Sequence, residues 1–495
     1  MGSKGKMQTV IAKRMAEVRA KRGRLVKEWS PYIGAVGEYL KENKEQELTE
    51  MDQFNIAQCL DNALLQTGLA SSSKLFEATY ADNIDFLGIQ LPIIAALLPS
   101  LVLNEIAIVQ AIDRRQAAVF YLDVLYGTDK GTVTAGDTMI GAKTGHATSA
   151  GARKYATTIV EDEALTSADD VLVSETITGN LEYDSVMLGT IVITDGTESF
   201  TDAARPGSLV SSISDAVVGW AAEDGSFSVT FATAPASSGL VSASYQYHYD
   251  QATDGVPSVN INLTASSLTA MDFPLQAAYS VGACLDLEKA HGVVLEDELV
   301  KYLGGEIKFE IDHYGIDLIE AAAISSDGAL STTGNGTWTA TPTSGQEWLW
   351  KKYEFLDKVE KASNGILSKT LRGFGNFIVC GNNVARVVRQ MGADHFKPAP
   401  GLNKAVPTGP IKLGTLDGRT VIQDPFLTSN RYIVGFRGDN YLFAGFIYAP
   451  YIPLFTTPTL ITADLMAQKG FLSSAGFKVI NPGLYTFGTV DVSEL

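Results

Sequence analysis

Cysteine, long apolar runs and positive charge are all scarce in this chain of 495 residues. The three cysteines, Cys59, Cys284 and Cys380, show no metal-ligand or redox spacing, which argues against a disulfide framework or a cysteine-rich zinc module. The formal net charge is −18 at pH 7. This charge argues against a protein that coats nucleic acid, because nothing global attracts phosphate.

Signals for membrane insertion and secretion are lacking as well. The longest apolar stretch, 91–103, contains two prolines and is shorter than the roughly 20 residues that a spanning helix needs. The N-terminus is basic but has no apolar core segment and no small-residue cleavage site. We therefore expect a soluble protein that is made in a cytoplasm.

Motifs that carry chemistry are also missing. The P-loop-like segment 136–144 has an extra residue before Lys143, and the glycines of 373–375 stand between a predicted helix and a strand, the reverse of a dinucleotide loop. The histidines lack HExxH spacing, and the acidic clusters 161–163 and 169–170 lack calcium-loop spacing. We expect no catalytic residue, no cofactor and no metal, although paired carboxylates of a hydrolase cannot be recognised in one sequence.

The first 50 residues have a charge pattern of their own. Residues 1–30 carry a net charge of +7, and residues 1–50 together carry +4. Helix formers dominate, and apolar residues recur at helical spacing. The pattern predicts an amphipathic helical leader.

The segment 127–260 is rich in Gly, Ser, Thr and Val and holds 18 acidic residues against five basic ones. Apolar residues alternate with polar ones at 227–231 and 241–249, which predicts a β-hairpin around 235–239 with one buried face. Asp-Gly pairs at 195–196 and 224–225 predict tight turns. We expect a small all-β sandwich with an acidic solvent face. The stripe Tyr245-Tyr247-Tyr249 fits the packed face of a strand better than a carbohydrate platform.

The sequence after residue 260 predicts a mixture of helices and strands. Apolar spacing within 286–324 predicts a helix of about 28 residues, on the order of 40 Å long, whose glycines at 304, 305 and 315 indicate bending or close packing. Further predictions are a helix at 348–361, a buried strand at 376–380, a helix 384–391 capped by Asn383, hairpins at 417–418 and 437–440, and a final strand region at 470–487.

An ordered series of segments then points to a known family. The segments are 114–127, 275–281, 286–292, 297–299, 306–307, 310–312, 375–380, 383–384, 432–438, 447–454, 476–478 and 480–482. Together they cover roughly half of the chain, and their shared order is more specific than any one of them. They resemble the major capsid proteins of T-even-type tailed bacteriophages (myoviruses).

The resemblance implies an α+β chain with the Hong Kong 97-type capsid fold, which has a long spine helix, peripheral and axial domains and an extended loop. The implied organisation is a leader or prohead segment at 1–50, an N-terminal arm at 51–105, the first arm of the extended loop at 106–127, an inserted β-rich domain at 128–260, a peripheral domain with the spine helix at 261–345, an axial domain at 346–450, and a return to the peripheral domain at 451–495.

The same resemblance implies function. Identical subunits would form hexamers of an icosahedral head shell that encloses double-stranded DNA without sequence-specific binding, in the virion and, during assembly, in the host cytoplasm. The implied partners are a vertex protein, a scaffold, a prohead protease and decoration proteins. That family's protease cuts after Glu in an apolar-x-Glu context, so Glu50 of Leu48-Thr49-Glu50 is the expected cleavage residue, although Glu38 also fits.

Three alternatives remain open. The chain could be the related vertex protein that forms pentamers, a β-rich carbohydrate-binding surface protein, or an acidic hydrolase.

Overall fold

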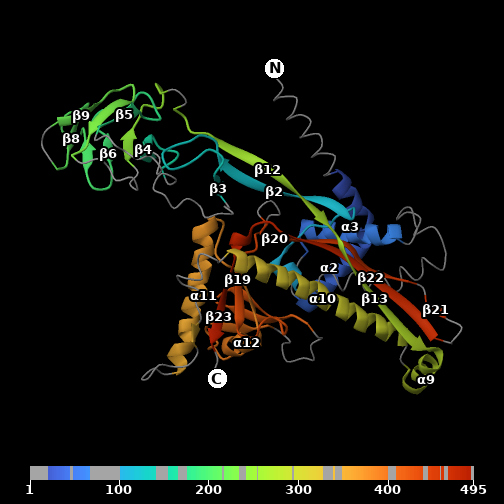
Figure 1. Cartoon of the computed structure of the whole chain (residues 1–495). Helices are drawn as coiled ribbons and strands as arrows, with labels where there is room; N and C mark the ends of the chain where they lie inside the picture. Colours follow the sequence, from blue (N-terminus) through green and yellow to red (C-terminus); the bar gives the residue numbers. More distant parts are fainter. Residues whose placement is uncertain are drawn as a thin grey trace. The chain divides into compact units, whose positions relative to one another are not determined.

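A computed structural model describes residues 20–44, 48–66, 101–140, 154–165, 176–213, 217–232, 241–252, 255–292, 295–326, 338–339, 348–399, 409–438, 444–457, 459–461 and 466–491. The predictions for residues 1–19, 91–100, 169–170 and 235–239 lie outside these ranges. The chain is α+β (Figure 1). Its contacts divide it into unit 1, Met1–Tyr121, Thr264–Ser368 and Arg372–Leu495, and unit 2, Leu122–Leu263 with Lys369–Leu371.

Helices form a large part of unit 1. They are α2 (Ser30–Lys44), α3 (Glu50–Gln66), α7 (Leu103–Ile106), α9 (Val281–His291), α10 (Leu295–Ser326), α11 (Trp348–Thr370) and α12 (Asn382–Arg389), and residues 20–28 are helical too. The predicted long helix is α10, which runs for 32 residues. Close packing is confirmed at Gly315, where an added Cβ would lie 2.5 Å from Cδ2 of Leu103 in α7. The helix predicted at 348–361 is longer than expected, because α11 continues to Thr370.

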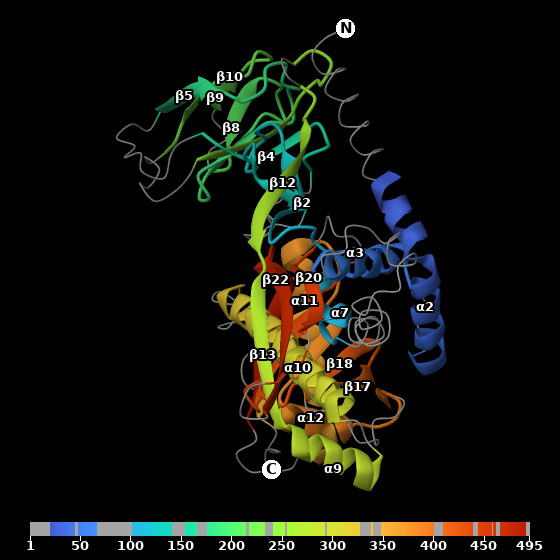
Figure 2. The same ribbon diagram turned by 90° about the vertical axis from the view of Figure 1, so that its right-hand side faces the viewer.

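The first sheet of unit 1 joins distant parts of the chain. Its strand order is β1 (Ile108–Val109), β20 (Phe446–Thr456), β22 (Met466–Val479) and β13 (Met271–Ser280), with β21 (Leu460–Ile461) also paired to β22. β13 and β22 are antiparallel from Met271↔Ala475 to Ser280↔Met466. α3 packs on β20, and α10 contacts both β13 and β22 (Figure 2).

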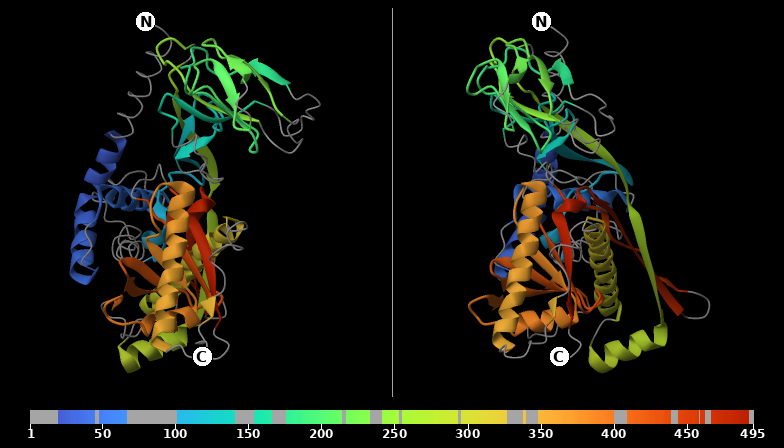
Figure 3. Two further views of the ribbon diagram at one scale, coloured as in Figure 1. Left: turned by 90° about the vertical axis from the view of Figure 1, so that its left-hand side faces the viewer. Right: turned by 60° about the vertical axis from the view of Figure 1, so that its left-hand side comes forward.

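The second sheet of unit 1 has the order β14 (Trp338–Thr339), β23 (Tyr485–Asp491), β19 (Arg431–Gly435), β15 (Phe377–Cys380), β18 (Arg419–Gln423), β17 (Ile411–Leu416) and β16 (Phe396–Pro398). Figure 3 shows α11 running beside this sheet, and Phe355 of α11 packs edge-on against Tyr432 of β19. The turn at 417–418 joins β17 to β18 as predicted. The turn predicted at 437–440 lies partly outside the described residues. Its flanking strands do not form the expected hairpin, because β19 and β20 belong to different sheets.

The predicted cap of α12 is wrong as well. Asn383 does not cap α12, since the helix starts at Asn382, two residues before the predicted Val384, and Gly381 occupies the cap position without a side-chain hydrogen bond. The Asn383 side chain instead donates a 2.6 Å hydrogen bond to Oδ1 of Asn430. A nearby polar partner in the folded chain therefore outweighs the local capping preference.

Unit 2 is built around one eight-stranded antiparallel sheet. Its order is β4 (Ile159–Ala164), β11 (Ser242–Gln246), β6 (Val192–Thr194), β7 (Ser199–Thr201), β8 (Ser208–Ser211), β9 (Val217–Ala221), β10 (Ser226–Thr230) and β5 (Thr176–Asn180). A second, three-stranded sheet has the order β12 (Val259–Thr269), β2 (Gln116–Tyr126) and β3 (Thr138–Ile140). The chain passes from unit 1 to unit 2 within β2 and returns to unit 1 within β12.

The predictions for this domain are partly right. The turns at 195–196 and 224–225 join β6 to β7 and β9 to β10, and both glycines have a positive φ. The expected pairing of β10 with β11 is wrong, because β10 pairs with β5 and β9, whereas β11 pairs with β4 and β6. The single buried face is confirmed, since alternate residues of both strands lie in one core cluster.

The predicted sandwich is also wrong. A single sheet curls around its own core, and Glu163 of edge strand β4 accepts a 2.8 Å hydrogen bond from the Glu182 amide, two residues beyond edge strand β5. The acidic solvent face is wrong for the sheet, since the outward positions from β5 to β11 carry Ser, Thr and other uncharged side chains. The acidic residues that the structure describes in the segment 127–260 lie in β4 and in the connections between strands.

Candidate functional site

The described part of the leader belongs to the core of unit 1. Leu25, Trp29 and Ile33 are buried, and Trp29 is completely inaccessible to solvent. The Arg22 guanidinium lies 4.8 Å from the centre of the Phe54 ring in α3, a distance at which cation and ring attract. Six consecutive residues of α3, 55–60, are buried, so this helix is covered on every side. The leader is therefore one of the layers that cover α3, in addition to being amphipathic as predicted.

Glu50, the expected cleavage residue, is the first residue of α3 and is exposed. Thr49 precedes it and forms a capping box with Asp52: the Asp52 amide donates to the Thr49 hydroxyl at 3.2 Å, and the Thr49 amide donates to the Asp52 carboxylate at 3.2 Å. The pattern Thr-x-x-Asp could have revealed this helix start from the sequence alone. The structure therefore places Glu50 within the first turn of a capped helix.

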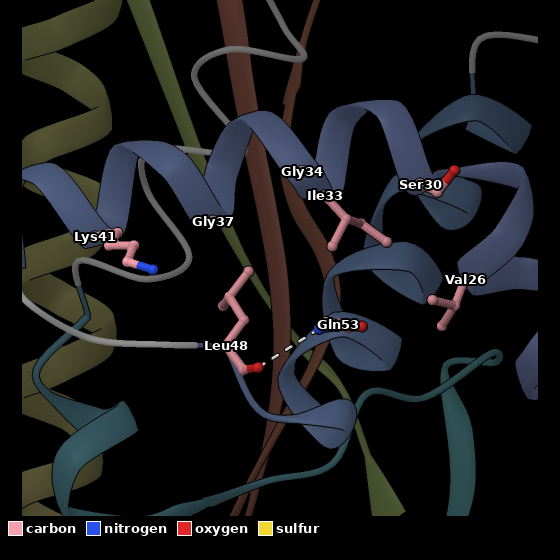
Figure 4. A pocket seen from close by; sticks show the side chains of 8 residues that line it. All are labelled: Val26, Ser30, Ile33, Gly34, Gly37, Lys41, Leu48 and Gln53. Carbon is pink, nitrogen blue, oxygen red and sulfur yellow. Dashed lines mark hydrogen bonds between the residues drawn. The ribbon is translucent and has the colours of Figure 1, made fainter.

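A pocket of about 400 Å³ lies beside this position, between α2 and the start of α3 (Figure 4). Leu48 points into it, 3.6 Å from where a Cβ on Gly37 would lie. The Gln53 side chain donates a 3.5 Å hydrogen bond to the Leu48 carbonyl (Figure 4). Two of the three residues of the expected cleavage motif, Leu48 and Thr49, are thus held by contacts within the subunit.

A buried carboxylate anchors the long helix α10. Asp312 is completely buried and accepts hydrogen bonds from the backbone amides of Val102 and Leu103, at 3.2 and 3.1 Å. Burial raises the pKa of the Asp312 carboxyl to about 6, although the two amide bonds act in the opposite direction. The sequence pattern did not identify Asp312. The only signal was a charged residue next to the apolar stripe of α10.

Unit 2 also contains buried ionisable groups. Burial raises the pKa of the Glu163 carboxyl to about 7 and lowers that of the Lys130 ammonium to about 8. The Lys130 ammonium donates to the carbonyls of Tyr155, at 3.0 Å, and Thr157, and lies 5.3 Å from the centre of the Tyr247 ring. These groups bind backbone and aromatic partners of their own domain, so their arrangement stabilises the fold.

The other candidate sites have structural explanations. Tyr245 and Tyr247 are buried, as expected for a packed strand face, whereas Tyr249 is 61% exposed and lies outside that face. Within the described ranges, no group of three or more His, Cys, Asp or Glu residues is arranged to hold a metal ion. Of the helices that the structure describes, none is both long and apolar enough to cross a membrane.

Two strands expose apolar residues to solvent. β12 leaves Val259, Ile261 and Leu263 exposed, and Ile261 is 71% exposed. In β21, Leu460 and Ile461 are both exposed. Neither strand contains a charged residue or a proline. Such residues usually prevent a free strand edge from pairing with another chain. These two strands are candidates for contact with another chain.

Two known proteins are similar to this chain in sequence. The major capsid protein of Enterobacteria phage T4 is 31% identical over 224 residues, and that of Vibrio phage KVP40 is 30% identical over 215 residues. The alignments cover 42% and 41% of this chain, and the same shares of the two relatives. The chain thus matches less than half the length of these curated relatives.

Solved structures give a weaker comparison. The capsid of Myoviridae phage XM1 is 11% identical, with a TM-score of 0.30, over 47% of this chain and 78% of that one. A TM-score this low does not establish a shared fold.

The family comparison covers much more of the chain. The model described as major capsid protein Gp23 matches residues 85–491, a range that contains α10, both sheets of unit 1 and the whole of unit 2. Because this match spans well over half of the sequence, the chain belongs to the Gp23 family of major capsid proteins.

Proposed function

We propose that this protein is the major subunit of a bacteriophage head shell and that it performs no catalysis. The observation that carries the proposal is the Gp23 match over residues 85–491. The two exposed strands β12 and β21 support it, because uncharged edges are suited to pairing between copies. Hexamers in an icosahedral lattice are the proposed assembly, in the virion and, before completion, in the host cytoplasm.

The Hong Kong 97-type fold is part of this proposal. In it, α10 is the spine helix of a peripheral domain at 261–345, residues 346–450 form the axial domain, and 451–495 return to the peripheral domain. Residues 51–105 form the N-terminal arm, 106–127 the first arm of the extended loop, and 128–260 its inserted domain, which faces outward and contacts a neighbouring subunit. Support comes from the 32-residue length of α10 and from the long antiparallel pairing of β13 with β22.

Removal of the leader after Glu50 is the proposed maturation step, with a prohead protease as the partner that performs it. Because Glu50 lies in the capped first turn of α3, that turn has to open before a protease can bind it in an extended form. The leader carries +4 of the net charge, so its loss leaves −22 on the remaining chain. An acidic wall repels the double-stranded DNA that it encloses, which prevents adhesion without sequence-specific contacts.

Electron microscopy of the protein, expressed with a scaffold and a chaperone of its phage, tests the proposal. We expect shells, tubes or hexagonal sheets. Monomers that persist under every condition would contradict it, and incorporation only at fivefold positions of a mixed shell would show that the chain is the vertex protein. N-terminal sequencing of mature particles tests the cleavage, since a terminus at Met51 is expected and an intact Met1 contradicts it.

A matched pair of variants tests the role of β12. Ile261→Lys places a charge on the exposed strand and should abolish lattice formation, whereas Ile213→Lys changes a residue of similar exposure, 64%, elsewhere in unit 2. Both variants should keep native circular dichroism, because both sites are solvent-exposed. Equal assembly by the two variants would show that β12 makes no subunit contact.

A further inference from the structure

The outward face of the eight-stranded sheet differs from the rest of its acidic domain. The segment 127–260 carries a net charge of −13, yet every described outward position from β5 across to β11 is uncharged. Serine and threonine fill most of these positions. The first charged residues on this side are Glu161 and Asp162 of the edge strand β4. The outward face of this sheet is therefore an uncharged surface made mostly of hydroxyl side chains.

Trp220 of β9 lies on this outward face. It is 51% exposed, although a tryptophan side chain is among the largest apolar groups that folding can bury. Strand register places it opposite Ser208 of β8 and Ser228 of β10, and Ser228 lies opposite Thr178 of β5. Residues directly opposite each other in a sheet share a face. One indole ring thus lies in a row of three hydroxyl side chains across four adjacent strands.

We propose that Trp220 and this hydroxyl row form a binding platform for a neutral saccharide. The apolar C–H face of a sugar ring packs against an exposed aromatic ring, and serine and threonine hydroxyls both donate and accept hydrogen bonds, as sugar hydroxyls do. Four strands at about 4.8 Å spacing span roughly 14 Å, which matches the length of a short oligosaccharide. The platform is distinct from the stripe Tyr245-Tyr247-Tyr249, two of whose rings are buried.

The charge of the face decides between classes of ligand. Nucleic acids and sulfated or sialylated glycans are anionic and are bound through Lys and Arg, which this face lacks at its described positions. A second copy of the chain would need an extended apolar centre. Among the described outward positions, Trp220, Val192 and Val210 are the apolar side chains, and these three fall short of the apolar core of a stable protein interface. A neutral saccharide fits because it requires neither cations nor a large apolar area.

Binding of the full-length chain to an array of oligosaccharides tests the proposal. The probes are neutral hexose and N-acetylhexosamine tetrasaccharides, together with sialylated and sulfated forms. We expect retention on at least one neutral probe that persists at high salt, because no ion pairs contribute. Trp220→Ala should weaken this binding at least tenfold, and Trp220→Phe should weaken it less. Tyr249→Ala, which removes an aromatic ring that is 61% exposed and lies outside the face, should leave this binding unchanged.

Several outcomes overturn the proposal: binding to none of the neutral probes, binding that Trp220→Ala leaves intact, or binding to charged probes alone. Self-association that Trp220→Ala abolishes, without saccharide binding, would instead assign the face to a second copy. The proposal does not rest on shell assembly. Trp220→Ala is expected to assemble normally, so failure of one proposal leaves the other standing.

Discussion

The two units of this protein are built from the chain in different ways. Unit 1 joins segments that are far apart in sequence, as in the pairing of β13 with β22, and it includes the described part of the leader. Unit 2 comes almost entirely from the continuous segment Leu122–Leu263, and its strands β6 to β10 pair in sequence order. The difference indicates that unit 1 depends on contacts between distant segments, whereas unit 2 behaves as an insert with a core of its own.

The largest expected effect tests whether the leader belongs to unit 1. Trp29→Ala removes a fully buried indole and should lower the free energy of unfolding of unit 1 by about 3–5 kcal/mol. Calorimetry and urea denaturation of the full chain measure this loss. Trp220→Ala, at an exposed site, is the control and should change stability by less than about 0.5 kcal/mol. Equal effects of the two substitutions would exclude the leader from the core.

The next prediction concerns the contact between Asp312 and α7. Asp312→Ala leaves the amides of Val102 and Leu103 without their acceptor in a buried site, which should cost unit 1 about 2–3 kcal/mol. Hydrogen exchange of these two amides should rise strongly. Asp312→Asn keeps one acceptor oxygen and should lose less. Unchanged exchange in Asp312→Ala would mean that other groups satisfy the two amides.

The third prediction concerns the pH dependence of unit 2, in which the Glu163 carboxylate accepts a hydrogen bond from the Glu182 amide. Burial raises the pKa of Glu163 from 4.5 to about 7, so its neutral form is favoured in the folded state. The stabilisation is complete below about pH 4.5 and is lost as the pH rises through 7, a change on the order of 2–3 kcal/mol. Melting of unit 2 between pH 5 and pH 8 measures it. Glu163→Gln should flatten this dependence, and an equally steep profile in that variant would assign the titration to another group.

The smallest effect is expected at the start of α3. Thr49→Ala removes the cap and should cost about 1 kcal/mol, whereas Thr49→Ser keeps a hydroxyl and should be nearly neutral. Hydrogen exchange in the first turn of α3 reports the loss. If Glu50 is the processing site, Thr49→Ala should also be cut faster by the prohead protease. Identical cleavage rates for the two variants would show that the capping box does not restrain processing.

Local features of the fold could be predicted from the sequence where the physical cause is local. Asp-Gly pairs favour tight turns through their own backbone preferences, so those at 195–196, 224–225 and 417–418 were predicted correctly. Apolar spacing indicated α10, because one side of a helix has to be buried. The pairing of β10 with β11 was wrong, since alternation shows which face is buried but not which strand lies alongside.

The candidate site was harder to predict. Glu50 came from a three-residue pattern, and its place in a capped helix follows from Thr49 and Asp52. The role of Asp312 depends on the amides of α7, about 210 residues earlier in the chain, and no local pattern reports a partner so distant. The same holds for Glu163, whose pKa depends on how far the sheet curls.

The sequence by itself determined that this chain is α+β, that an acidic β-rich domain interrupts it, and that it resembles a family of capsid proteins. These conclusions rest on composition, periodicity and short ordered motifs, which are properties of neighbouring residues. Only the tertiary structure decided that the leader helps to cover α3, that a single sheet curls around its own core, and that the outward face of this sheet is neutral around Trp220. Each of these depends on which distant segments meet, because burial and strand order arise when the whole chain packs.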